Sequence, residues 1–319
     1  MIELSKEFIP TTDEVWRLQG AQDRDAIMFQ EMANKGHYRK VGGSRQGIYI
    51  CSPSGALLSS VNSLNPVVVL EIVQKGLDAW NQLPIHERKL PEDFTKDIEH
   101  RWEDSYPEGG LILKGAKADL LSDPPKFSER GDRWNMDHVW FNKSEAKKWI
   151  PKNYIKGERA ECPKIIKDRL FRFHLVDNVR GQTLPFAPQE IKKSNLQVEI
   201  VEINNLELKL NITGSSLAIA KGPWLLGEND WTPDHILDHS IETNVLGSAI
   251  YNIAEEKFKD FELVIIGRWN GKTQNNGRKL GPNDGHIGIV YNIADDSYTN
   301  KIAPAFVDLY NADWITQPQ

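Results

Sequence analysis

The feature that most constrains the fold is an alternation of apolar and polar residues in the second half of the chain. The alternation runs through Gln197–Ile203, with one break where Ile200 and Val201 are adjacent, and again through Leu206–Ile212. A period of two is that of a β-strand with one buried face. The intervening Asn204-Asn205 suits a tight two-residue turn. The sequence therefore predicts an antiparallel β-hairpin at this point.

The same reasoning extends β-structure towards the end of the chain. Apolar runs bounded by turn residues predict further strands at Ser216–Ala220, Gly247–Ile253, Phe261–Trp269 and Gly285–Ile293. About six antiparallel strands in succession are typical of a sheet sandwich or an open barrel. Before them, the sequence predicts a short strand at His138–Phe141 and helices over Asn142–Trp149 and from Cys162-Pro163. Residues 134–319 are therefore expected to form an α+β domain.

The N-terminal part, residues 1–83, has a different order of elements. The predicted elements are a strand at Phe8–Thr11, a helix at Asp25–Lys35, strands at Gly47–Cys51 and Ala56–Val61, and a helix that Asn65 caps and Pro66 begins. Residues 84–133 are rich in proline and polar residues, so we expect an irregular linker or wrapping segment there.

This order of N-terminal elements resembles the second half of a thioredoxin-like domain. The segment Gln46–Leu58 is similar to the strand–turn–strand hairpin of that family, and the resemblance covers about a quarter of the chain. The chain also resembles uncharacterised bacterial proteins that join such a domain to a longer C-terminal region. The Cys-x-x-Cys motif is absent, and Arg45-Gln46-Gly47 stands where the family has its cis-proline. Because thiol–disulfide exchange needs a reactive thiol and a resolving partner, the resemblance implies a truncated scaffold or interaction unit without redox activity.

Composition narrows the class of protein. The 319 residues carry a formal net charge of −6, which argues against nucleic-acid binding, because phosphate contacts need clustered Lys and Arg. No run approaches the roughly 18 apolar residues of a membrane span. Two cysteines, Cys51 and Cys162, are too few for a disulfide scaffold, and Cys51 is expected to be buried in its strand. The N-terminus lacks the apolar core of a signal peptide, so we expect a cytoplasmic protein unless a leader has been removed.

The first candidate site is the cluster His174, Asp177 and Arg180, at the end of a predicted helix that Gly181 stops. A histidine beside a carboxylate suits a general base or a metal ligand. Arg180 and Gln182 could clamp an anionic or amide-bearing substrate. The apolar neighbours equally suit a buried structural network in which these groups pair with one another. Both interpretations stay open.

The second candidate is a histidine pair. His235 and His239 would lie on one face of a helix that begins at Thr232-Pro233, with the spacing by which two imidazoles share a metal. A divalent metal is the cofactor this pair would hold; the cofactor is otherwise unknown. No third ligand is marked by spacing, and two histidines on an exposed helix face are the alternative.

The third candidate is the loop Gly267–Arg278, which follows the most apolar strand of the chain. Its side chains are rich in hydrogen-bond donors, and the ligand-binding residues we expect there are Arg268, Thr273, Asn276 and Arg278. Such loops bind phosphate, sulfate or carboxylate groups well. A solvated hairpin loop is the alternative.

Together these clusters favour an enzyme, or a binding protein derived from one, that acts on a small polar or anionic ligand. His174 would be the general base or metal ligand, and Asp177 would orient it. Arg180, Arg268 and Arg278 would hold the anion. Whether the protein is an enzyme stays open. The alternative is a non-catalytic interaction module whose thioredoxin-like part presents an apolar surface to a protein partner.

Overall fold

The computed structural model describes residues 2–11, 15–38, 44–90, 106–120, 134–181, 183–204, 206–221, 238–272, 276, 278 and 283–305. The chain divides into two compact units, Met1–His100 and Arg101–Gln319. No helix among the described residues combines the length and the apolar character needed to cross a membrane.

The N-terminal unit is a small α/β assembly around a two-stranded sheet. Its elements are α1 (Ile2–Ser5), α2 (Val15–Gly20), α3 (Arg24–Lys35), β1 (Ile48–Cys51), β2 (Leu57–Val61), α4 (Pro66–Gln82) and the 3₁₀ turn η1 (Ile85–Arg88). Strands β1 and β2 pair antiparallel. The order helix, two strands, helix confirms the elements predicted from Asp25 to Trp80.

Local sequence signals fix the ends of the two long helices. Asp23 caps α3 by accepting from the N–H of Ala26, and Asn65 caps α4 by accepting from the N–H of Val67. Pro66 then occupies the first turn of α4, where its missing N–H costs nothing. These caps explain why α4 begins at Pro66, as the sequence predicts, and why α3 begins at Arg24, one residue before the predicted start.

Two N-terminal predictions are wrong. Residues 8–11 form no strand, because the chain leaves α1 through turns at Lys6–Phe8. Cys51 is exposed instead of buried, because it is the last residue of β1 and the register shifts at that point.

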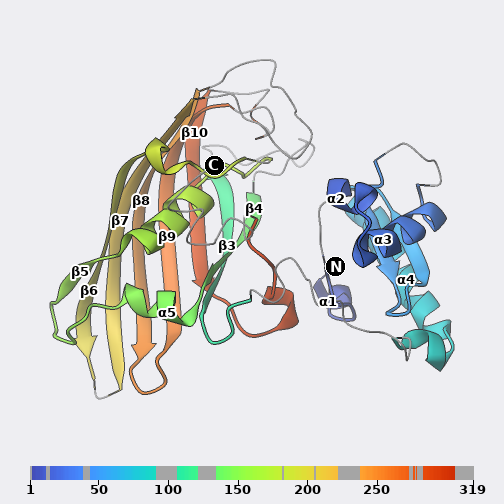
Figure 1. The fold of residues 1–319 in the computed structure, drawn as a ribbon, viewed down its shortest axis with the longest axis horizontal. Helices are drawn as coiled ribbons and strands as arrows, with labels where there is room; N and C mark the ends of the chain where they lie inside the picture. The colour runs from blue at the N-terminus through green and yellow to red at the C-terminus, as the bar shows by residue number, and fades with distance from the viewer. Residues whose placement is uncertain are drawn as a thin grey trace. The chain divides into compact units, whose positions relative to one another are not determined.

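The C-terminal unit is built on one open antiparallel sheet of eight strands, in the order β4-β3-β10-β9-β8-β7-β6-β5 (Figure 1). The strands are β3 (Leu111–Leu120), β4 (Trp134–Phe141), β5 (Arg159–Glu161), β6 (Ile191–Ile203), β7 (Glu207–Lys221), β8 (Asp238–Asn252), β9 (Lys257–Gly271) and β10 (Asp284–Ile293). The hairpin predicted around Asn204 is confirmed as β6–β7, and Ser216–Ala220 continues β7.

Helical segments cover one face of this sheet, which we call the inner face. They are α5 (Lys143–Ala146), η3 (Lys147–Trp149), α6 (Lys164–Asp168) and the π-helical turn η4 (Arg169–His174), with the shorter 3₁₀ turn η5 (Pro188–Glu190). The 3₁₀ turn η6 (Tyr298–Asn300) lies on the other face, where Asn300 accepts from Lys114. One continuous core joins inward side chains of the strands, such as Leu263 and Ile265, to Trp149, Ile166 and Leu170 of the helical layer. Figure 1 shows these helices lying across the curved sheet. The α+β class is therefore correct, with a single eight-stranded sheet in place of a sandwich.

Two further predictions need correction in this unit. Strand β3 lies within residues 84–133, which we expected to be irregular. The prediction missed this strand because its many Ala, Gly and Lys residues obscure the alternation of apolar and polar positions. The helix predicted from Thr232 does not reach His239, which lies on β8 and pairs with Gly271 of β9. The remainder of that predicted helix, including His235, is outside the described residues.

The close approach of α4 to the small hairpin gives a first prediction. A Cβ on Gly76 would lie 2.7 Å from Cγ2 of Ile50 and 2.8 Å from Oγ of Ser59. We expect Gly76→Val to lower the free energy of unfolding of the N-terminal unit by about 1–3 kcal/mol through overpacking. Chemical denaturation measures this loss. Gly20, whose Cβ would meet nothing within 4 Å, supplies the control Gly20→Ala, which should leave that free energy within about 1 kcal/mol; equal losses would contradict the proposed packing.

Candidate functional site

Asp137, on the edge strand β4, is the centre of a buried polar cluster. Its Oδ2 accepts from Tyr291 Oη at 2.6 Å and from His174 Nδ1 at 3.0 Å, and it pairs with Lys117 Nζ at 3.0 Å. Its Oδ1 accepts from the backbone N–H of His138 at 2.9 Å. We call Asp137, His174, Tyr291 and Lys117 the Asp137 cluster. Each of the four is at most 6% exposed, between the inner face and η4.

His174 reaches Asp137 from the end of a π-helical turn. The N–H of Leu175 donates to the carbonyl of Leu170, five residues earlier, at 2.9 Å. Such turns are rare and recur at functional sites. Lys117 donates to the carbonyl of His174 and to Asn178 Oδ1. One buried lysine therefore satisfies both the end of this helix and the carboxylate beside it.

A second buried ion pair fixes the start of the helical layer. Asn142 and Glu145 form a reciprocal cap at the start of α5. The other Glu145 oxygen accepts from Arg169 at 2.6 Å, and Arg169 also donates to the carbonyl of Trp140 at 2.7 Å. These contacts join α5, η4 and β4, so the segment that carries His174 is held at both ends.

The charges in the Asp137 cluster determine which groups are protonated. Burial alone would raise the pKa of Asp137, but Lys117 and the hydrogen bonds from His174 and Tyr291 hold it well below its usual range. Burial lowers the pKa of His174, and the nearby Asp137 only partly opposes this effect. The cluster therefore contains an ionised aspartate and a neutral histidine, whose Nδ1 carries the proton donated to Asp137.

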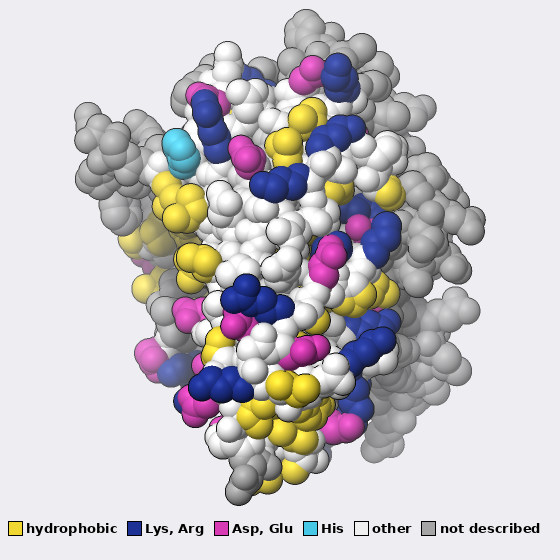
Figure 2. All heavy atoms as spheres, turned by 90° about the vertical axis from the view of Figure 1, so that its left-hand side faces the viewer, with side chains coloured by type: hydrophobic (Ala, Val, Ile, Leu, Met, Phe, Trp, Pro, Cys, Tyr) yellow, Lys and Arg dark blue, Asp and Glu magenta, His cyan; other side chains and the backbone are white. Residues whose placement is uncertain are grey.

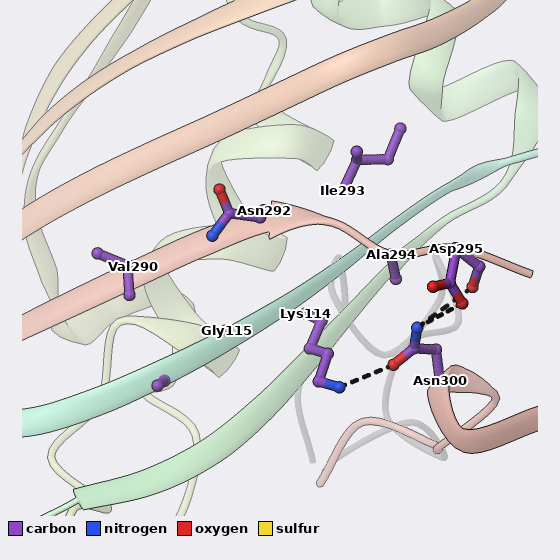
Figure 3. Close-up of a pocket in the computed structure, with 9 residues that line it drawn as sticks. Lys114, Gly115, Val290, Asn292, Ile293, Ala294, Asp295 and Asn300 are labelled. Carbon is purple, nitrogen blue, oxygen red and sulfur yellow. Dashed lines mark hydrogen bonds between the residues drawn. The ribbon is translucent and has the colours of Figure 1, made fainter. Parts of the chain in front are cut away.

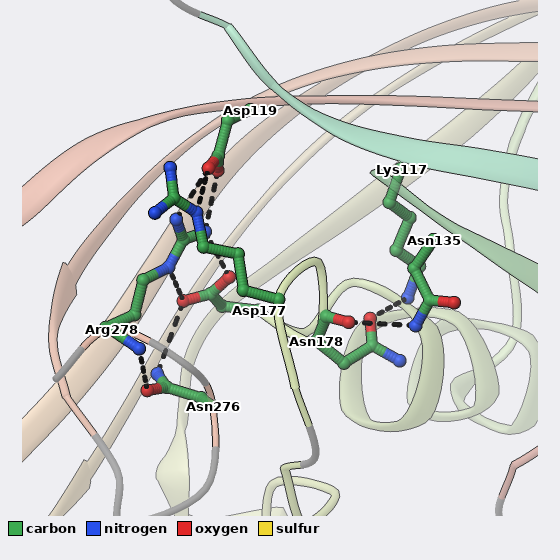
Figure 4. Close-up of polar contacts among 8 residues, drawn as sticks. Lys117, Asp119, Asn135, Asp177, Asn178, Asn276 and Arg278 are labelled. Carbon is green, nitrogen blue, oxygen red and sulfur yellow. Dashed lines mark hydrogen bonds and ion pairs between the residues drawn. The ribbon is translucent and has the colours of Figure 1, made fainter. Parts of the chain in front are cut away.

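Arg278 organises a second cluster on the same side of the sheet (Figure 4). It donates to both oxygens of Asp119 at 2.7 Å and to both oxygens of Asp177 at 2.6 and 3.0 Å. Arg180 donates to Asp119 at 2.7 Å, and the Arg278 guanidinium lies 4.0 Å from the ring centroid of Trp269. Burial opposes the charge of Arg278, but the hydrogen bonds to Asp177 and Asp119 outweigh it and raise its pKa. Two guanidinium groups thus balance two carboxylates.

The structure brings only some of the expected site residues together. Asp177, Arg180 and Arg278 meet around Asp119, and Asn276 donates to Asp177 at 3.4 Å. The carboxylate that contacts His174 is Asp137, in place of Asp177. Arg268 lies on the opposite face of β9 and pairs with Asp284 in solvent.

The remaining expected residues give no metal or anion site that can be described. Gln182, Thr273 and His235 are outside the described residues. His239 lies on β8 and stacks on Phe186, with ring centroids 5.4 Å apart. Within the described ranges, no three His, Cys, Asp or Glu side chains come close enough together to hold a metal ion.

Both clusters are closed. In the Arg278 cluster the side chains of Arg278 and Asp119 are 2% and 3% exposed, and their hydrogen bonds go to one another. A substrate in solution therefore does not reach His174 or Arg278 in this conformation. This arrangement fits the structural alternative for these residues, in which buried charges are paired and fully hydrogen-bonded.

An accessible polar pocket lies on the other face of the sheet, which we call the outer face (Figure 3). Its volume is about 360 Å³, and its walls are Lys114, Gly115, Ala116, Val290, Asn292, Ile293, Ala294, Asp295 and Asn300. Lys114 Nζ donates to Asn300 Oδ1 at 2.9 Å, and Asn300 Nδ2 donates to Asp295 Oδ1 at 2.8 Å. We call this the Lys114 pocket.

The sequence reading missed Asp137, Lys117, Asp119 and Tyr291. A signal was present in β3, where Lys117 and Asp119 share the parity of the buried Leu113. Two charged residues at inward positions indicate buried partners for those charges. The signal was lost because the segment was expected to be irregular.

Comparisons with known proteins add no identity: the chain matches no family model, no curated protein and no solved structure. Functional inference therefore depends on the geometry of the chain itself.

The Asp137 cluster predicts a large loss of stability on neutralisation. Asp137→Asn would leave Lys117 buried without a counter-ion, so we expect the free energy of unfolding of the C-terminal unit to fall by about 3–5 kcal/mol. Chemical denaturation followed by tryptophan fluorescence measures this. The control Asp260→Asn, at an exposed position of β9, should change the free energy by less than about 0.5 kcal/mol. A similar small effect at both positions would refute the role of Asp137.

The neutral His174 predicts a pH dependence of stability. Its pKa is lower in the folded chain than in the unfolded chain, so the unfolded chain binds the proton first. Its contribution is complete above about pH 6.5 and is lost as pH falls below that value. We expect the free energy of unfolding to fall from pH 7 to pH 5, with a slope of at most about 1.4 kcal/mol per pH unit from this residue. His174→Gln should flatten the profile, and an unchanged slope would show that His174 is not the titrating group.

Proposed function

We propose that the C-terminal unit binds a small polar ligand bearing a carboxylate or amide group in the Lys114 pocket. The observation that carries the proposal is the combination of a half-buried ammonium group with amide side chains in an accessible concavity. Lys114 keeps donors beyond the one directed at Asn300, since an ammonium group has three. Asn292 adds an exposed amide on β10. The Asp137 and Arg278 clusters serve as the rigid support behind this face.

The charge balance of the pocket limits the ligand class. Asp295 faces the same concavity as Lys114, and hydrogen bonds from Ser297 and Asn300 lower its pKa, so it is ionised. A dianion would meet repulsion from Asp295, whereas a single carboxylate or an amide can bind between Lys114 and Asn292. The pocket therefore favours monocarboxylates, zwitterions and amides over phosphate.

His138 supports the same location. It lies directly opposite Lys114 in the register of β4 and β3, and it is 4% exposed. Its Nε2 has no hydrogen-bond partner among the described residues. Burial lowers the pKa of His138, so the ring is neutral and can donate or accept. His138 is not among the residues that line the pocket, so a ligand would reach this buried nitrogen only if the neighbouring side chains moved.

A non-catalytic interaction module is the second candidate function. The observation that favours it is the exposed apolar surface of strands β8, β9, β10, β3 and β4, described below. A thioredoxin-like N-terminal unit would fit such a role, and the helix–hairpin–helix order of that unit supports this proposal.

Ligand binding can be tested with one variant of the pocket. Isothermal titration of the full chain against a panel of amino acids, their amides and small monocarboxylates should find at least one that binds. Lys114→Met keeps most of the side-chain volume and removes the charge, so we expect it to weaken that binding about tenfold or more.

Asn211→Ala, at an exposed position on the same face of β7, is the matched control and should bind as the wild-type chain does. No binding by any member of the panel, or equal affinity for wild-type and Lys114→Met protein, would reject the proposal.

A further inference from the structure

The outer face of the sheet carries two neighbouring cross-strand rows of apolar residues. The register places Leu246, Val264, Val290, Ala116 and Met136 in one row across β8, β9, β10, β3 and β4. The next row contains Ile266, Gly288, Ala118 and Trp134, and the side chain of Leu120 lies over Gly288. We call these ten residues the outer apolar patch.

The patch is exposed and local. Its seven large side chains, Leu120, Trp134, Met136, Leu246, Val264, Ile266 and Val290, are 40–64% exposed. The same two rows continue across β7 and β6 as Thr213, Gln197, Ser215 and Asn195, which are polar. Figure 2, which faces the left-hand side of Figure 1, shows hydrophobic side chains along the left border and also at the lower end of this face, with mostly polar side chains between them. A solvent-facing sheet would have the polar pattern throughout, so the patch indicates a covered surface.

Contact through the edge of the sheet is disfavoured. The outward N–H groups of Met136 and His138 on edge strand β4 are taken by the side-chain oxygens of Asn135 and Asp137, both at 2.9 Å. The carbonyl of Trp140 accepts from Arg169. These groups cannot pair with a further strand. The patch must therefore be covered face to face.

The pattern of the patch is complementary to itself. On β9, the outward residues are Glu262, Val264, Ile266 and Arg268, in that order. Consider a two-fold axis that lies in the plane between two facing sheets and runs perpendicular to the strands. Each strand then faces the same strand of the second copy, and the order of residues along that strand is reversed. The axis sets Val264 against Ile266 and Glu262 against Arg268 of a second copy. On β10 and β4 it sets Val290 against Gly288 and Met136 against Trp134, so a large side chain on β10 meets a small one. On β8 it sets Leu246 against the polar Asn244, and on β3 it sets Leu120 against Lys114.

The available area suits a dimer. Five strands at about 4.8 Å spacing and six residues at about 3.3 Å rise give roughly 500 Å² in projection. Because side chains project from the sheet, the accessible area of this surface is larger than its projection and approaches the roughly 800 Å² per partner of a standard interface. Along the strands, the positions on either side of the two apolar rows include charged residues such as Glu262 and Arg268 on β9, and these would form the rim of the interface.

We propose that the outer apolar patch is the interface of a symmetric homodimer, in which Glu262 of each copy pairs with Arg268 of the other. Two sheets then pack face to face in the aligned manner of a β-sandwich. Ala116 and Val290 belong both to the patch and to the walls of the Lys114 pocket, so the dimer would cover that side of the pocket. The dimer does not depend on the proposed ligand.

Charge reversal tests the proposed symmetry. Sedimentation velocity of the full chain, up to about 100 µM protein, should show a dimer. Glu262→Arg and Arg268→Glu should each weaken dimerisation about tenfold or more, because like charges then face each other. The double variant restores opposite charges and should recover dimerisation to within about threefold. Arg268→Glu also loses its pair with Asp284, but the double variant keeps that change, so its recovery reports on the interface alone.

The control Asn211→Arg places a positive charge on β7, in the cross-strand row that contains Glu262 but outside the patch. This variant should leave the dimer intact. Circular dichroism of each variant verifies that the sheet is folded. A monomeric wild-type chain would overturn the proposal. So would a dimer that is insensitive to both single reversals, or a double variant no better than either single one.

Discussion

The architecture of the C-terminal unit depends on the ion pair between Lys117 and Asp137. Neither group could be buried alone, because an isolated charge in a protein interior is far too unfavourable. Together with His174 and Tyr291 they make a charge-balanced, hydrogen-bonded cluster. Lys117 lies on β3, Asp137 on β4, Tyr291 on β10 and His174 on the helical layer. One cluster therefore ties three strands to the helix that covers them and fixes the position at which that helix ends.

The Arg278 cluster extends this principle along β3. Asp119 lies two residues beyond Lys117 and faces the same side, so the strand presents a cation and then an anion to the interior. The chain from His174 to Arg180 crosses both positions and supplies the partner of each. A segment of irregular backbone is thus held against the sheet by ionic contacts, and its own polar groups are satisfied by the same residues. These ionic contacts fix the position of the segment on the sheet, because an apolar contact would let the segment slide and a bidentate ion pair would not.

The sequence predicted β6 and β7 well because each has one apolar and one polar face, and the period of two is then visible in the residues alone. Of β8 (Asp238–Asn252) it predicted only the part from Gly247. It failed for β3, where Lys117 and Asp119 point inward and Ala116 and Ala118 point outward, so the expected alternation is reversed. It also connected His174 to Asp177, the nearest carboxylate in the chain, whereas Asp137 is adjacent only through strand pairing. Cross-strand proximity of this kind is set by register, and no local pattern encodes the register of β4 against β3. The candidate residues around Arg278 were found because donors were abundant in one loop, but the carboxylates that pair with them come from a helix end and a strand.

The reversed polarity of β3 and β4 links the closed interior to the exposed exterior. In these two strands the charges of Lys117, Asp119 and Asp137 are buried and Trp134 and Met136 face outward, the opposite of an ordinary solvent-facing sheet. The strands β6 and β7 keep the ordinary polarity, so the reversal is a property of one part of the sheet and not of the fold. An outer face with large apolar side chains is compatible with water only where another surface covers it. In the proposed dimer, a second copy with the same rows in reverse order would provide that cover.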